Sequence, residues 1–86
     1  MARTRIENIA YGKSQQIAAE GCFAISFFRP TTAPAVQVEG IDIEAGQTLS
    51  IKQNVGDEDW STYQLTFADN QDNTNLLHVI KVMPIL

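Results

Sequence analysis

The segment Cys22–Arg29, with the sequence CFAISFFR, restricts the possible folds of this chain more than any other stretch. Side chains of a β-strand alternate between two faces, so Phe23, Ile25 and Phe27 fall on one face. The opposite face carries small side chains until Phe28. Both faces are therefore apolar. This predicts a central strand that contacts the core on one side and a second layer or a second chain on the other.

The segment Asn75–Met83 is also apolar on both faces. One face carries Leu77, Val79 and Met83 together with Lys81. The other face carries Leu76, His78, Ile80 and Val82. A chain of 86 residues buries only roughly 60% of its unfolded surface, so one core does not absorb two strands that are apolar on both faces. The pattern predicts a homo-oligomer, either a dimer or a trimer.

Short alternating segments separated by turn sequences make up the rest of the chain. The most regular, Trp60–Ala68, places Tyr63, Leu65 and Phe67 on the predicted core face. No segment has a helical stripe of apolar residues. About seven short strands of this kind predict an all-β fold, a small antiparallel β-sandwich or barrel.

Glycine marks a change of phase in the middle of the chain. Val36 and Val38 share one face before Gly40, and Ile41 and Ile43 carry the apolar face after it. A tight turn or a bulge at Glu39-Gly40 explains the shift. Both isoleucines are predicted to face the core.

The charge is divided unevenly along the chain. Residues 1–13 carry three basic residues and one acidic residue, a net charge of +2, whereas the remainder carries three basic and nine acidic residues, a net charge of −6. We expect residues 1–13 to form an N-terminal arm or edge strand and residues 14–86 to form a single β-sandwich domain. The arm either docks onto another copy or is simply solvated. The acidic body disfavours nucleic acid and anionic membranes as partners.

Residues with reactive side chains are few. The single cysteine, Cys22, excludes an internal disulfide and lies in an apolar strand, which predicts a buried, inert thiol. His78 is the only histidine, and packing is a better explanation for it than catalysis. The acidic run Asp57-Glu58-Asp59 either holds a hard cation or, as we expect, forms a solvated loop. We therefore predict no enzyme activity and no catalytic, cofactor-binding or metal-binding residue.

Trp60 lies on the otherwise polar face of its predicted strand, beside the acidic run. An exposed indole suits stacking on a sugar or anchoring a subunit interface, and the third alternative is that a loop covers it. The first alternative gives the rival function, a small carbohydrate- or peptide-binding β module. The residues expected in an interface between copies are Arg3, Arg5, Ile6, Ile9, Tyr11, Trp60, Leu76, His78, Ile80 and Val82.

Two segments carry a resemblance to a known group of proteins. The segments GIDIEAGQTLSI (Gly40–Ile51) and WSTYQLTF (Trp60–Phe67) resemble small β-sandwich structural proteins of tailed bacteriophages, of the head-decoration, head-fibre and tail-associated types. The resemblance implies an assembly role, homomeric packing, and capsid or other virion proteins as partners. The chain shows no signal peptide and no membrane-spanning run, so we expect synthesis in the cytoplasm and, if the resemblance holds, location in a virion.

Overall fold

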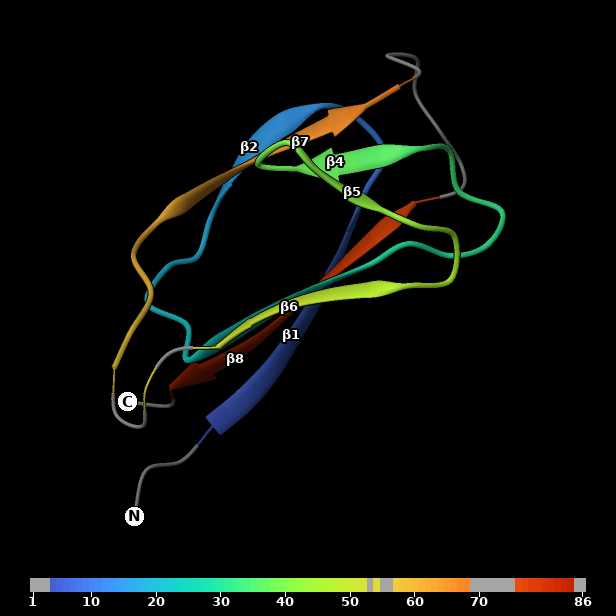
Figure 1. Ribbon diagram of the computed structural model, residues 1–86. Helices are drawn as coiled ribbons and strands as arrows, with labels where there is room; N and C mark the ends of the chain where they lie inside the picture. The colour runs from blue at the N-terminus through green and yellow to red at the C-terminus, as the bar shows by residue number, and fades with distance from the viewer. Residues whose placement is uncertain (1–3, 53, 55–56, 69–75, 85–86) are drawn as a thin grey trace.

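The computed structural model describes residues 4–52, 54, 57–68 and 76–84. These residues form eight strands in two four-stranded antiparallel sheets that pack face to face (Figure 1). The predicted all-β sandwich is confirmed, with eight strands instead of about seven, and the two sheets do not close into a barrel. Arg3 and the polar run Asp69–Asn75 lie outside the described residues.

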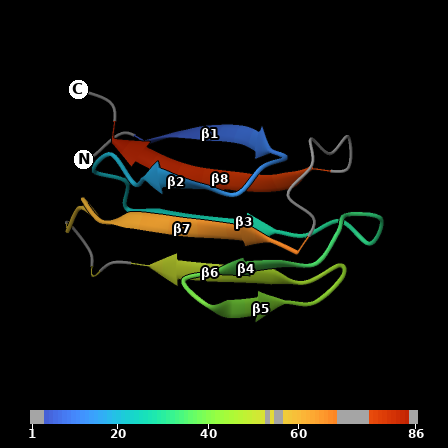
Figure 2. The same cartoon turned by 90° about the horizontal axis from the view of Figure 1, so that it is seen from above.

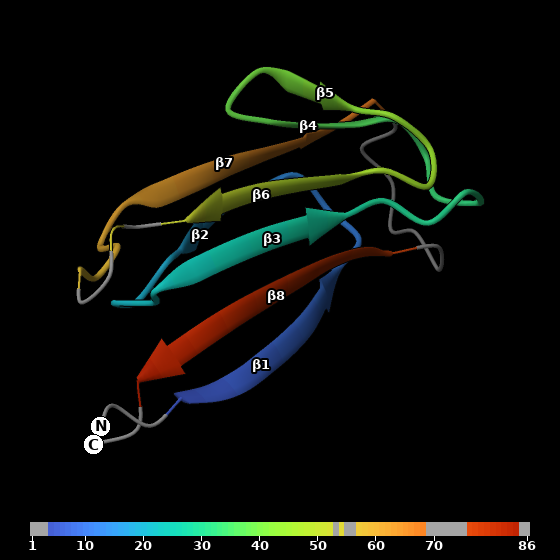
Figure 3. The ribbon, with the colours of Figure 1, turned by 60° about the horizontal axis from the view of Figure 1, so that its bottom comes forward.

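Sheet A has the strand order β1-β8-β3-β6 (Figure 3). Its strands are β1 (Thr4–Tyr11), β8 (Leu77–Pro84), β3 (Ala24–Phe28) and β6 (Thr48–Lys52). The predicted central strand is β3, which pairs with β8 on one side and β6 on the other. Residues Thr4–Tyr11 form an edge strand that pairs with β8 along its full length.

Sheet B has the strand order β2-β7-β4-β5. Its strands are β2 (Gln15–Ala18), β7 (Thr62–Phe67), β4 (Val36–Val38) and β5 (Ile41–Ile43). The hairpin between β4 and β5 has two loop residues, Glu39 and Gly40, with φ values of 52° and 78°. Positive φ at both positions matches the right-handed strand twist, which explains the tight turn predicted there.

The core lies between the two sheets and joins the buried faces of both. Ile25 and Phe27 from sheet A meet Tyr63, Leu65 and Phe67 from sheet B, as predicted. The rings of Phe27 and Tyr63 contact edge to face, with 5.6 Å between their centroids. Leu49 and Ile51 are partly buried against this cluster.

The predicted alternation is wrong at the start of the central strand. Cys22 is fully buried in the core, whereas Phe23 is only half-buried and lies outside the core cluster. The physical reason is that β3 begins at Ala24, so Cys22 and Phe23 belong to the turn that crosses from one sheet to the other. Strand alternation does not apply within such a turn.

Sheet B is displaced sideways relative to sheet A, so that β1 overhangs on one side and β5 on the other (Figure 2). Ile9 and Ile41 both lie on inward faces, opposite the buried Val79 and Val38 in register. Their side chains are nevertheless 41% and 53% exposed, because the opposite sheet does not reach them. Ile41 thus lies on the predicted apolar face of its strand together with Ile43, but the core covers only Ile43.

Candidate functional site

The outward surface of sheet A, which we call the outer A face, carries apolar side chains on three strands, with polar side chains such as Asn8 and Ser26 among them. In register, Ile6 lies opposite Val82, and Val82 lies opposite Ala24 on its other side. The neighbouring rows are formed by the following residues: Asn8, Ile80 and Ser26, then Ala10, His78 and Phe28. Ile6 is 73% exposed. The second apolar face of the C-terminal strand, predicted from the sequence, thus continues across three strands.

Charge is nearly absent from the outer A face. Lys52 is the only Asp, Glu, Lys or Arg among the described strand residues that point to this side. The His78 imidazole lies beside the Phe28 ring, with 6.2 Å between centroids. The corresponding outward surface of sheet B, the outer B face, is polar instead, with Gln16, Gln64 and Thr66 pointing outward.

The residues predicted for the interface divide into separate groups. Ile6, His78, Ile80 and Val82 lie together on the outer A face, and Leu76 lies just before β8. Ile9 and Tyr11 lie on the inward face of β1, where Tyr11 packs against the core. Arg5 and Trp60 line a hollow at the end of the sandwich where β1 begins and β8 ends.

This second candidate, the Trp60 hollow, has a volume of about 330 Å³. Its walls combine charged, apolar and aromatic groups from strands β1 and β8 and from two connecting segments: Arg5, Glu20, Gly21, Glu58, Trp60, Met83 and Pro84. The Trp60 side chain is 72% exposed, so no described part of the chain covers it in the way that one alternative required. The indole Nε1–H donates a hydrogen bond to Glu58 Oε1 at 3.2 Å.

Gly21 determines how the indole lies. A Cβ at this position would come within 2.7 Å of Trp60 Cζ2 and within 3.0 and 3.1 Å of the adjacent Cη2 and Cε2. Such similar distances to three consecutive ring atoms mean that the glycine backbone lies against the flat face of the ring. Gly21 also has a φ of 80°, which other residues rarely adopt. One face of the indole therefore rests on Gly21.

Asp59 anchors the segment that carries Trp60. It is 4% exposed, so the expectation of a solvated loop is wrong at this residue, although Asp57 and Glu58 are exposed. Its Oδ1 accepts a hydrogen bond from the Ser61 amide at 2.8 Å, and its Oδ2 accepts one from the Tyr63 hydroxyl. Its backbone bridges to Cys22 and Gly21 through two hydrogen bonds of 2.8 Å. A buried carboxylate is tolerated because it is hydrogen-bonded in this way.

The sequence analysis assigned no separate role to Asp59, although the local sequence around it is typical of a turn. An aspartate that accepts from the amide two residues later forms a local turn, and Asp59-Trp60-Ser61 has the residue types for it. The burial itself depends on Tyr63 and Cys22, which come from other parts of the fold.

Lys81 and Glu20 connect the two sheets beside the hollow. Lys81 is 2% exposed, and its Nζ donates to Ala18 O at 2.7 Å and to Glu20 Oε1 at 2.9 Å. The hydrogen bond and the charge of Lys81 hold the pKa of Glu20 below its ordinary value. Glu20 is thus an ionised carboxylate at neutral pH, fixed at the rim of the Trp60 hollow.

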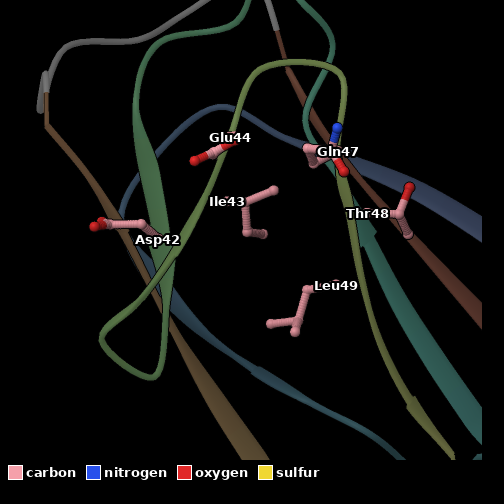
Figure 4. Close-up of a pocket in the computed structure, with 6 residues that line it drawn as sticks. All are labelled: Asp42, Ile43, Glu44, Gln47, Thr48 and Leu49. Atoms are coloured by element: carbon pink, nitrogen blue, oxygen red, sulfur yellow. The ribbon is translucent and has the colours of Figure 1, made fainter.

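A further hollow lies between the edge strands β5 and β6 and has a volume of about 270 Å³ (Figure 4). Figure 4 shows Ile43 and Leu49 in the space between the strands, with the Asp42 side chain pointing away from Gln47 and Thr48. Asp42 accepts a hydrogen bond from Gln37 Nε2 at 2.7 Å. The described residues of the lining include no histidine, cysteine, serine or lysine, so they show no activated nucleophile beside a base.

The described residues do not assemble a reactive or metal-binding centre. Burial raises the pKa of the Cys22 thiol, and nearby Asp59 raises it further, so the thiol is the protonated, inert form predicted for it. No group of three histidine, cysteine, aspartate or glutamate residues in the described ranges is placed to hold a metal ion. The described residues also contain no helix that could cross a membrane.

No family model, curated protein or solved structure matches this chain. The resemblance to phage structural proteins therefore stays a prediction from the sequence.

Proposed function

We propose that this chain is a non-enzymatic structural or assembly protein that forms homo-oligomers through the outer A face. The observation that carries the proposal is the apolar surface of Ile6, Phe28, Ile80 and Val82, which extends over three strands of a sheet whose other face already forms the core. A surface of this kind is typical of a subunit interface.

The charge distribution favours a second copy as the occupant. The chain carries a net charge of −4, so most approaches between two copies bring acidic surfaces together. No described strand residue that points to the outer A face carries a carboxylate, so two copies can meet there without repulsion between acidic groups. Strand β1 carries part of this face and is the edge strand of sheet A, so no other described strand pairs with its outer edge.

A bacteriophage virion is the setting that we propose for this assembly, as a capsid-decoration, head-fibre or tail component. The support for it is the sequence resemblance at Gly40–Ile51 and Trp60–Phe67, together with the homomeric packing that such proteins use. Finding the chain by mass spectrometry in purified particles, and not only in the cell lysate, tests this setting.

Solution mass by multi-angle light scattering tests the oligomer at micromolar concentration. The wild-type chain is expected to have the mass of a dimer or trimer. Ile80→Glu places a carboxylate in the middle of the outer A face and is expected to give the monomer mass. The matched control is Thr66→Glu, which makes the same change on the outer B face in the equally central strand β7 and is expected to leave the mass unchanged.

Two results contradict the proposal. If the wild-type chain has the mass of a monomer, it does not form the proposed homo-oligomer. An Ile80→Glu variant that is folded by circular dichroism and keeps the oligomer mass would show that the interface lies elsewhere.

A further inference from the structure

The Trp60 hollow lies at the end of the sandwich and adjoins the outer A face at Pro84, and its walls have a different composition. Among the described lining residues, Met83 and Pro84 supply aliphatic side chains, whereas Arg5, Glu20 and Glu58 bring charged groups around one exposed indole. Its volume of about 330 Å³ is at the lower end of the range for small-ligand sites, about 300–1,000 Å³. A small polar ligand with an apolar face fits this combination.

The indole is held in place before any ligand arrives. One face rests on the Gly21 backbone, and Nε1 is bonded to Glu58. The flanking residues are fixed as well, because Asp59 bridges to Cys22 and the Ala19 amide donates to Ser61 O at 2.9 Å. An aromatic platform that is already ordered loses little entropy on binding. The open face of the ring is therefore a preformed stacking surface.

The polar groups around the ring each have a partner, and they supply both kinds of hydrogen-bonding group. Lys81 holds Glu20 at 2.9 Å, and Glu7 holds Arg5 at 3.0 Å. Each carboxylate keeps lone pairs beyond the one used in these contacts, and the Arg5 guanidinium keeps further N–H donors. Two carboxylates against one guanidinium give the lining a net charge of −1, which disfavours an anionic ligand.

We propose that the Trp60 hollow binds a neutral pyranose sugar. The C–H face of the sugar ring stacks on the open face of the indole, and its hydroxyls donate to Glu20 and Glu58 and accept from Arg5. Aromatic stacking and hydroxyl-to-carboxylate hydrogen bonds together use every fixed polar and aromatic group of the hollow. The site does not depend on the outer A face, so the chain can assemble and bind sugar independently.

Trp60 is the only tryptophan, so its emission reports on the site directly. The folded wild-type chain is titrated with neutral sugars: glucose, galactose, N-acetylglucosamine and the β1,4-linked disaccharides of glucose and N-acetylglucosamine. At least one is expected to give a saturable change in emission. Glucuronic acid, which adds a carboxylate to the same ring, is expected to bind more weakly than glucose.

The variant Trp60→Ala is compared by saturation-transfer NMR, which observes the sugar and needs no tryptophan. Because the side chain is 72% exposed, the variant is expected to fold. Its affinity is expected to fall by about tenfold, the loss of a favourable aromatic contact. The matched control Thr62→Ala, on the outer B face two residues away, is expected to bind as the wild type does.

Three results overturn the proposal. One is the absence of a saturable response to every sugar in the panel. Another is a Trp60→Ala variant that binds as tightly as the wild type. The third is a blue shift of Trp60 emission that follows protein concentration without sugar, since this would mean that a second copy covers the hollow. Light scattering tests the homo-oligomer separately, so failure of one proposal is distinguishable from failure of the other.

Discussion

The outer faces of the two sheets differ although both sheets share one core. The outer A face presents the apolar residues Ile6, Phe28, Ile80 and Val82 among polar ones such as Asn8, Ser26 and Ser50. The outer B face presents mainly polar side chains: Gln16, Gln37, Asp42, Thr62, Gln64 and Thr66. A sandwich needs only its inward faces to be apolar. Sheet B follows this pattern, and sheet A departs from it. The apolar residues of the outer A face therefore contribute something other than the core.

The largest loss of stability is expected on substituting one of two neighbouring phenylalanines, which point to opposite sides of β3. Phe27 is fully buried in the core and Phe28 is half-buried on the outer A face. Phe27→Ala is expected to lower the free energy of unfolding by about 3–5 kcal/mol, because it removes buried contacts and leaves a cavity. Phe28→Ala is expected to cost less and to weaken self-association instead.

Urea unfolding measures the stability of both variants, and light scattering measures their mass. Equal losses of stability would show that both faces of sheet A belong to a core. A Phe28→Ala variant with unchanged oligomer mass and dissociation would place the interface away from this ring.

A smaller loss of stability is expected on breaking the buried hydrogen bond between Tyr63 and Asp59. Tyr63→Phe removes the hydroxyl that donates to the buried Asp59 carboxylate, and it is expected to cost about 1–3 kcal/mol at pH 7. Thermal melting and urea unfolding at pH 7 check this loss. Tyr11→Phe is the matched control, because it deletes the same hydroxyl from a residue at the margin of the core.

Tyr63→Phe is also expected to change how the free energy of unfolding depends on pH in the alkaline range. Burial, and then Asp59, raise the pKa of Tyr63 above its ordinary range, and burial raises that of Cys22. The unfolded chain ionises these groups near about pH 8.5 for cysteine and about pH 10 for tyrosine. The folded chain keeps these protons to a higher pH than the unfolded chain does. The free energy of unfolding is therefore at its full value below these pH values and decreases as the pH rises above them.

Unfolding of the wild type between pH 7 and pH 11 is therefore expected to show a fall above about pH 9. Tyr63→Phe is expected to make this fall shallower, since only the Cys22 contribution remains. A variant with the same alkaline slope as the wild type would show that Tyr63 ionises equally in the folded and unfolded chain.

The sequence was sufficient to predict what depends on local alternation. The inward faces of β7 and β3 follow from residues such as Leu65 and Phe27, and the turn at Glu39-Gly40 follows from the change of phase. The second apolar face of β8 was also visible, because alternation assigns both faces of a strand at once. These features require no knowledge of which strands are neighbours.

The features that depend on distant neighbours could not be predicted. Ile41 is exposed because sheet B is displaced sideways, and no local pattern encodes that displacement. Lys81 is buried because Ala18 and Glu20 accept its hydrogen bonds from the other sheet. The Trp60 hollow needs Arg5 and Trp60 to meet at one end of the sandwich, although they are far apart in the sequence.

In the proposed homo-oligomer, a second copy covers the outer A face and leaves the outer B face open. Thiol labelling tests it most directly, because the native Cys22 is buried and its raised pKa keeps it unreactive at neutral pH. Asn8→Cys introduces a thiol on the outer A face beside Ile80, and Thr66→Cys introduces one on the outer B face. Both positions are exposed in the single chain, so their reactivities are comparable before assembly.

Labelling with a maleimide is measured at a dilution that gives monomers and at a concentration that gives the oligomer. We expect the thiol at position 8 to react quickly in the dilute sample and slowly in the concentrated one, and the thiol at position 66 to react quickly in both. Equal labelling of the two thiols at both concentrations, with the oligomer present by light scattering, would show that the outer A face is not the interface.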